Sequence, residues 1–113
     1  LHDSQDLAFQ KIKDEPVIIK LYFRFKGTPT PIGVSIKKYE KHWLDFVSSK
    51  IMSIMSFDQR KALNISRAIL TLRLGFYHRV ATSQTPAKEA IEAREGLELM
   101  YQQIFRNHSA AFN

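Results

Sequence analysis

The chain has no cysteine among its 113 residues. Disulfide bonds, thiol-based catalysis and thiolate metal sites are therefore excluded. The lack of cysteine fits a reducing compartment, and the N-terminus shows no basic patch followed by an apolar segment that would mark a signal peptide. We therefore expect a cytoplasmic protein.

Long hydrophobic runs are also missing. No stretch approaches the roughly 18 to 20 apolar residues that a membrane-spanning helix needs, so the sequence predicts no membrane span. Only four glycines are present, and they form no glycine-rich phosphate loop. The serines lie outside any G-x-S-x-G nucleophile motif. We expect no enzymatic activity, no catalytic residues, no cofactor and no small-molecule substrate.

Histidine is too widely spaced to suggest a metal site. No two of the four histidines form a local pair such as H-x3-H, which is a common zinc-binding spacing. We therefore predict no metal ligands. The four residues are His2, His42, His78 and His108.

Positive charge is what the sequence has in excess. The chain carries 17 Lys and Arg against 11 Asp and Glu, a net charge of +6. Residues 16–81 hold twelve of these basic residues but only three acidic ones, Glu40, Asp45 and Asp58. Such a basic region attracts polyanions, which include nucleic acid, acidic lipid headgroups and acidic protein surfaces. The alternative is a domain that is basic for no functional reason.

The composition is that of an ordinary folded protein, with 44% apolar and 25% charged residues. We expect one small globular domain over residues 1–113, with residues 1–15 and 107–113 loosely held. The predicted class is α+β and mostly helical. It comprises a short N-terminal helix, one β-hairpin and then three helices around a single core.

The predicted hairpin lies in residues 17–36. Residues 17–26 are β-branched and aromatic, and they alternate in a period of two. The turn signals of residues 27–31 follow, and then a second short alternation at Ile32, Val34 and Ile36. In this strand one face carries Ile19, Leu21, Phe23 and Phe25, and the other carries Lys20, Tyr22, Arg24 and Lys26.

Helical spacing begins after the hairpin. The pattern predicts a first helix over residues 38–55. Ser56 begins a capping-box motif of the form S-x-x-Q, which predicts a second helix over residues 57–81. Thr85 followed by Pro86 predicts the start of a third helix that runs to about Arg106.

The middle helix of these three has a wide apolar arc and a narrow face that is basic and polar, without an acidic residue. Arg and Lys bind phosphate oxygens, and Asn and Thr add hydrogen bonds, so this face is a candidate nucleic-acid surface. Its residues are Arg60, Lys61, Asn64, Arg67, Thr71, His78 and Arg79. The alternative is a solvated face that pairs with glutamates of the last helix.

The outward face of the hairpin is the second candidate surface. Tyr22 lies among Lys20, Arg24 and Lys26. An aromatic ring on a strand can stack on a base while neighbouring cations hold the backbone. The alternative is that Tyr22 is an edge aromatic that covers a helix.

Arg73 lies at the centre of the apolar arc, where a buried charge needs a partner. We favour an ion pair with a glutamate of the last helix. The alternative comes from residues 73–78, Arg-Leu-Gly-Phe-Tyr-His, which resemble the R-x4-H signature of HEPN-type helical ribonucleases. That resemblance implies that Arg73 and His78 act on RNA, although Leu74 stands where the family usually has a polar residue. The candidate partners of Arg73 are Glu89, Glu92, Glu95 and Glu98.

Two further segments resemble RNA-binding families. Residues 67–77 (Arg67-Ala68-Ile69-Leu70, then Leu72, Leu74 and Tyr77) together with residues 85–91 resemble the closing helices of the NusB antitermination family. That family is all-helical, so the expected hairpin is a departure from it. Residues 31–36, followed by a basic helix, are similar to the ProQ/FinO RNA chaperones, whose later hairpin is missing here.

The sequence therefore predicts a non-enzymatic binding or regulatory module whose basic surface contacts the backbone of RNA or DNA. The alternative is a protein-interaction domain, such as a homodimeric adaptor or a chaperone-like subunit. It rests on the apolar helices and the edge hairpin, which leave more apolar surface than 113 residues readily bury. Its partner would present an acidic or an apolar surface.

Overall fold

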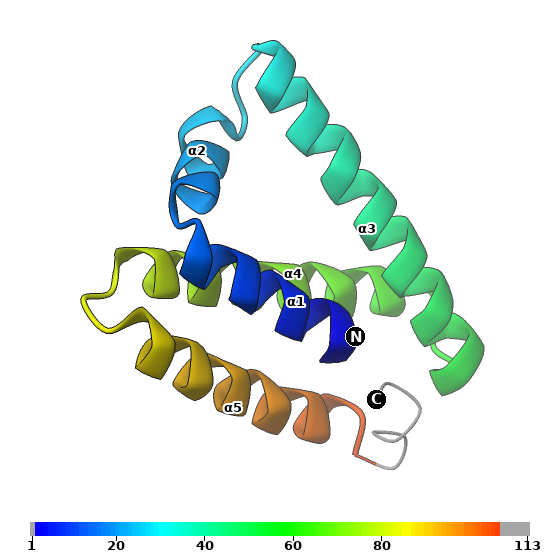
Figure 1. The fold of residues 1–113 in the computed structure, drawn as a ribbon. Coiled ribbons are helices and arrows are strands. Elements are labelled where there is room, and N and C mark those ends of the chain that lie inside the picture. The colour runs from blue at the N-terminus through cyan, green and yellow to red at the C-terminus, as the bar shows by residue number, and fades with distance from the viewer. Residues whose placement is uncertain (1, 107–113) are drawn as a thin grey trace. The chain divides into compact units, whose positions relative to one another are not determined.

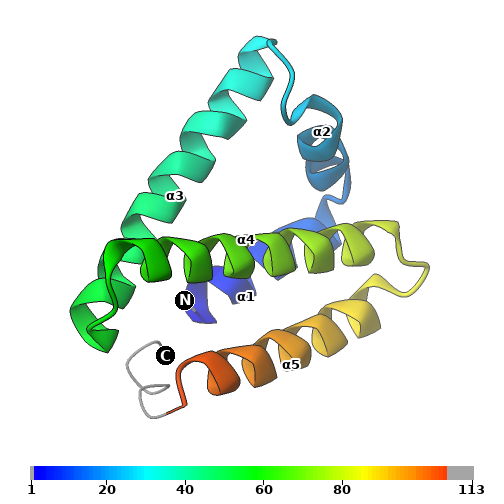
Figure 2. The ribbon, with the colours of Figure 1, turned by 180° about the vertical axis from the view of Figure 1, so that it is seen from behind.

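The computed structural model describes the backbone of residues 2–106 and the side chains of residues 5–106. These residues form five α-helices and no strand, so the predicted α+β class with its β-hairpin is wrong. The expected loose tail at residues 107–113 lies outside the described residues. The helices, shown in Figures 1 and 2, are α1 (His2–Asp14), α2 (Val17–Phe25), α3 (Pro31–Met55), α4 (Gln59–Thr82) and α5 (Pro86–Ile104).

The chain groups into two compact units, and α2 and α4 contribute to both. Unit 1 comprises Leu1–Lys20 and Leu72–Asn113, and unit 2 comprises Leu21–Thr71. Unit 2 contains nine Lys and Arg but three Asp and Glu, whereas unit 1 contains eight of each sign. Unit 2 therefore has a net charge of +6, which equals the net charge of the whole chain, and unit 1 is neutral.

Unit 1 is built from four helical segments, which are α1, residues 17–20 of α2, residues 72–82 of α4, and α5. Helix α1 lies beside α5 in both ribbon views (Figures 1 and 2). Phe9 of α1 meets Tyr77 of α4 edge to face, with 5.0 Å between the ring centroids. The buried apolar side chains of this unit are Phe9, Ile12, Ile19, Tyr77, Val80, Ala81, Ala93, Leu97, Tyr101 and Phe105.

Unit 2 contains α3, residues 59–71 of α4 and the second half of α2. Its buried apolar residues are Val47 and Ile51 of α3, with Ala62 and Ile69 of α4. Ser66 is buried among them, and its hydroxyl donates to the Ala62 carbonyl oxygen at 2.8 Å. Because this bond stays within the helix, a polar group is buried without leaving an unsatisfied donor.

Most of the segment expected to form the first strand, residues 17–26, is helical, and residues 17–25 of it form α2. Seven of its nine residues are apolar or aromatic, so the segment satisfies a period of two and a period of 3.6 equally well. Pro16 precedes the helix, where its missing N–H is not needed. Its carbonyl oxygen accepts from the Lys20 N–H at 3.4 Å, which closes the first turn.

The segment expected to form the second strand, residues 32–36, is also helical and forms the start of α3. The turn between α2 and α3 contains Gly27 with a φ of 78°, a value that glycine adopts without steric cost. Thr30 is the N-cap of α3, and Pro31 occupies its first position. Helix α3 therefore begins at Pro31 rather than near residue 38, which explains why the predicted hairpin fails.

The predicted capping box at Ser56 is also wrong. Ser56 ends α3 in the left-handed conformation, with φ 55° and ψ 30°. Asp58 caps the next helix instead, because its Oδ1 accepts from the Lys61 backbone N–H at 2.8 Å. A carboxylate is favourable here, at the positive end of the helix dipole. Helix α4 accordingly begins at Gln59.

Candidate functional site

The face of α4 predicted to bind nucleic acid is exposed in unit 2. Arg60, Asn64, Arg67 and Thr71 lie three or four residues apart, so they share one side of the helix. Arg67 Nη1 donates to Asn64 Oδ1 at 3.3 Å, and the Thr71 hydroxyl donates to the Arg67 carbonyl oxygen at 2.9 Å. The adjacent Lys61 is also exposed. We call these five residues the α4 stripe.

Lys61 is held by a neighbouring aromatic ring. Its Nζ lies 4.1 Å from the centroid of the Phe57 ring, a distance at which a cation is attracted to the ring face. Lys61 is itself exposed, so its charge lies on the surface. The α4 stripe therefore presents three cations without a carboxylate among them.

Each carboxylate of unit 2 already binds another group. Glu40 contacts residues of α2, as described below, and Asp45 accepts from Lys41 Nζ at 2.8 Å. Asp58 Oδ1 accepts from the backbone N–H of Lys61 and thereby caps α4. The three acidic groups of the unit thus each bind another group, and Arg60 and Arg67 are exposed.

The last two residues of the predicted face, His78 and Arg79, are exposed but lie in unit 1. Arg79 Nε donates to Glu89 Oε1 of α5 at 2.8 Å. For Arg79, the alternative of pairing with a glutamate of the last helix therefore holds. The seven predicted residues are divided between the units, five in unit 2 and two in unit 1.

The four residues assigned to the hairpin surface do not share a face, because α2 turns by about 100° per residue. Tyr22 and Lys26 lie one turn apart and both contact Glu40 of α3. The Tyr22 hydroxyl donates to Glu40 Oε2, and Lys26 Nζ lies 2.6 Å from both carboxylate oxygens. Burial, and then the Glu40 carboxylate, raise the pKa of Tyr22 far above its ordinary value. Arg24 and Lys20 are exposed elsewhere on the helix.

A cavity between α2 and α3 was missed by the sequence analysis. It has a volume of about 450 Å³ and lies entirely in unit 2. Five of its residues recur at helical spacing from Pro31 to Tyr39, a signal that the hairpin prediction concealed. The cavity is lined by Tyr22, Pro31, Ile32, Ser35, Ile36 and Tyr39.

Arg73 is buried in unit 1, with 4% of its surface exposed. Its Nε donates to the Tyr77 hydroxyl at 2.8 Å. Burial raises the pKa of Tyr101 to about 12, with the charge of Arg73 acting against this and that of Glu98 adding to it. The charges of Arg73 and Glu98 therefore both act on the Tyr101 hydroxyl. His78 is exposed while Arg73 is buried, so the two residues of the R-x4-H motif do not face a common site.

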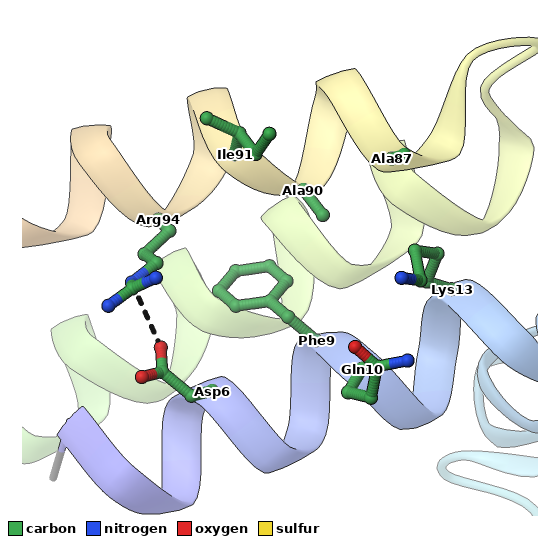
Figure 3. Close-up of a pocket in the computed structure, with 8 residues that line it drawn as sticks. All are labelled: Asp6, Phe9, Gln10, Lys13, Ala87, Ala90, Ile91 and Arg94. Atoms are coloured by element: carbon green, nitrogen blue, oxygen red, sulfur yellow. Dashed lines mark ion pairs between the residues drawn. The ribbon is translucent and has the colours of Figure 1, made fainter.

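Unit 1 has a second cavity of about 280 Å³ between α1 and α5 (Figure 3). Phe9 points from α1 toward α5, and Asp6 faces Arg94 across the cavity with 3.0 Å between Oδ1 and Nε. Asp6 thus neutralises one of the two bases of the lining, Lys13 and Arg94. Its lining residues are Asp6, Phe9, Gln10, Lys13, Ala87, Ala90, Ile91 and Arg94.

Within residues 2–106, no group of three or more His, Asp and Glu side chains is arranged to hold a metal ion. No helix in the same range is both long enough and apolar enough to cross a membrane. Comparison of the chain with protein-family models, with curated proteins and with solved structures found no match. The function is therefore inferred from the residues of this chain.

Proposed function

We propose that the chain is a binding module whose unit 2 contacts the phosphate backbone of nucleic acid. The observation that carries this proposal is the distribution of charge. Unit 2 holds the whole net charge of +6 within residues 21–71, and unit 1 is neutral. A concentrated positive charge attracts the most highly charged polyanion in its surroundings and accelerates its association.

The α4 stripe supplies the groups that a phosphate contact requires. Arg60 and Arg67 are seven residues apart, which is about 10.5 Å along a helix. Each guanidinium has five N–H donors in a planar fork that fits two phosphate oxygens. The Asn64 oxygen is used by Arg67, which leaves its amide NH₂ as a further donor. The Thr71 proton is already donated to the Arg67 carbonyl oxygen, so Thr71 adds little.

The test is fluorescence anisotropy with labelled single-stranded RNA and labelled duplex DNA, at salt concentrations of about 50 and about 200 mM. The wild-type chain is compared with the double variant Arg60→Ala/Arg67→Ala. A matched control, Lys11→Ala/Lys88→Ala, removes two exposed cations of unit 1 that pair with glutamates one turn away. Both variants lose the same net charge, so any difference between them depends on position.

We expect the logarithm of the wild-type association constant to fall linearly with the logarithm of the salt concentration. The slope should be about 0.7 to 0.9 per phosphate contact. The Arg60→Ala/Arg67→Ala variant should bind more weakly and have a slope lower by about 1.4 to 1.8, because two contacts are lost. The control should keep the wild-type slope. Absence of wild-type binding at about 50 mM salt, or an equal loss in the control, would contradict the proposal.

A protein-interaction function remains the alternative, and one observation favours it. Several large apolar side chains on α3 are exposed, among them Ile32, Tyr39 and Phe46. Exposed apolar patches on soluble proteins commonly mark contacts with other molecules. A homodimer formed through such a face would be almost insensitive to salt, so sedimentation velocity at the same two salt concentrations separates the two functions.

A further inference from the structure

Three large side chains form a line on the exposed surface of α3. Ile32, Tyr39 and Phe46 are 51%, 61% and 68% exposed. They are spaced by seven residues, which is close to two helical turns, so they lie along one side of the helix about 10.5 Å apart. None of the three is among the buried residues of α3, which are Gly33, Val47, Ser48 and Ile51.

The cavity lined by Tyr22 and Tyr39 lies at the N-terminal end of this line. Ile32 and Tyr39 belong to both the line and the cavity lining, and the Tyr22 ring of α2 forms another part of that lining. The Tyr22 hydroxyl is bonded to Glu40, which fixes the position of its ring. The remaining lining is aliphatic except for Ser35, which adds a hydroxyl to those of Tyr22 and Tyr39. An open cavity with aromatic rings, aliphatic walls and hydroxyl groups suits a flat, partly polar ring.

Cations accompany the aromatic line. Lys50 is exposed and lies one turn beyond Phe46 on the same side of α3. At the other end, Lys26 Nζ is held by Glu40 beside the cavity residue Tyr22. Glu40 balances the charge of Lys26, so the cation beside the exposed aromatic rings is Lys50, in the unit that carries the whole net charge of the chain.

We infer that this face of α3, with its cavity, binds unpaired bases of single-stranded nucleic acid through stacking on Tyr39 and Phe46. The inference rests on the proposed function, since the surrounding positive charge holds the backbone. Every base has a flat face that can stack on an aromatic ring, and single strands expose it whereas duplexes do not. A second copy of the chain is a less suitable occupant, because pairing two units of charge +6 brings like charges together.

The experiment uses the double variant Tyr39→Ala/Phe46→Ala and two labelled probes. One probe is a single-stranded oligouridylate of about 12 nucleotides, and the other is a DNA duplex of similar length. A matched control, Ile91→Ala/Leu99→Ala, removes two exposed apolar side chains of α5 in unit 1. A second control, Tyr39→Phe, retains the ring and removes only the hydroxyl. Circular dichroism checks that each variant is folded.

The expected result is a loss of affinity for the single strand of about tenfold to several hundredfold in Tyr39→Ala/Phe46→Ala. Duplex affinity and the salt slope should stay within about twofold of wild type, because the phosphate contacts are retained. Both controls should bind the single strand as the wild type does. The α4 stripe variant should behave differently, with weaker binding of both probes and a lower salt slope.

Two results would overturn the inference and leave the proposed function intact. One is an equal effect of the ring variant on single strand and duplex, and the other is no effect on either while wild-type binding still falls with salt. Conversion of a dimer into a monomer by Tyr39→Ala/Phe46→Ala would also overturn it, because the face would then be a protein contact. Absence of wild-type binding to both probes would overturn both.

Discussion

The backbone N–H of Gly33 donates a hydrogen bond to Thr30 Oγ1 at 3.1 Å. This contact begins α3 directly after the turn that follows α2. A Cβ atom at Gly33 would clash with the carbonyl oxygen of Thr28 and lie 2.7 Å from that of Phe25. The corner between α2 and α3 therefore has room for a hydrogen atom at position 33 and for nothing larger.

Gly33→Ala should destabilise the protein, because the obstructing atoms belong to the backbone and cannot rotate away. Overpacking of this kind costs about 1 to 3 kcal/mol. Gly75→Ala is the matched control, since a Cβ there meets no atom within 4 Å, and it should add about 0.5 to 1 kcal/mol of helix stability. Urea unfolding followed by circular dichroism gives both values. A neutral or stabilising effect of Gly33→Ala would show that the corner is less tight than described.

Thr30→Ala should lower the free energy of unfolding by about 1 kcal/mol, because the hydroxyl that caps α3 is lost. Thr85 precedes a helix-initiating proline in the same way, but its side chain makes no capping hydrogen bond. Thr85→Ala should therefore change stability by only a few tenths of a kcal/mol. Equal losses in the two variants, measured by the same urea titration, would argue against a cap at Thr30.

The N-terminal helix and the helices beyond residue 38 follow from the sequence, and the helical conformation of residues 17–25 and 31–37 does not. Thr85-Pro86 predicts the start of α5 correctly, and the same two residue types at Thr30-Pro31 begin α3. The β-branched and aromatic residues of 17–25 favour a strand, and they led to a hairpin prediction in spite of the helix-start signal at Thr30-Pro31. A segment with so few polar residues fits either period, and tertiary contacts then decide between strand and helix.

The candidate site shows a similar division. The acid-free face of α4 is visible in the sequence because its members recur at helical spacing, and its residues are exposed. The sequence does not show which side chain each charged residue pairs with, because that pairing depends on tertiary structure. Arg79 meets Glu89, which is ten residues away on the next helix, and Glu40 meets Tyr22 and Lys26. The basic region of residues 16–81 is visible in the sequence, but the boundaries of unit 2 are not, because they fall inside α2 and α4.

Tyr77→Phe should destabilise unit 1 through Arg73. The Tyr77 hydroxyl accepts from Arg73 Nε at 2.8 Å, and both side chains are buried. Loss of a hydrogen bond to a buried charged group costs about 1.5 to 3 kcal/mol. The control Tyr39→Phe removes a hydroxyl from an exposed ring and should change stability by less than about 0.5 kcal/mol. Thermal unfolding of both variants makes the comparison, and similar melting temperatures would show that Arg73 does not depend on Tyr77.

Stability should fall at alkaline pH because of Tyr101. Burial is the largest cause of its raised pKa of about 12, against an ordinary value of 10.0. The hydroxyl is neutral when protonated, so between these two values the unfolded chain loses a proton that the folded chain keeps. Deprotonation then favours the unfolded state, and the contribution of Tyr101 is present below pH 10 and is lost as the pH rises toward 12.

The variant Tyr101→Phe isolates this effect, since phenylalanine does not titrate and the lysines are unchanged. The free energy of unfolding of the wild type should fall more steeply between about pH 9.5 and 11.5 than that of the variant. A shift of two pKa units corresponds to about 3 kcal/mol, which is the upper bound for the difference. Urea titrations at four or five pH values measure both curves. Parallel curves would mean that the Tyr101 hydroxyl reaches solvent in the folded state, and that burial beside Arg73 does not hold its proton.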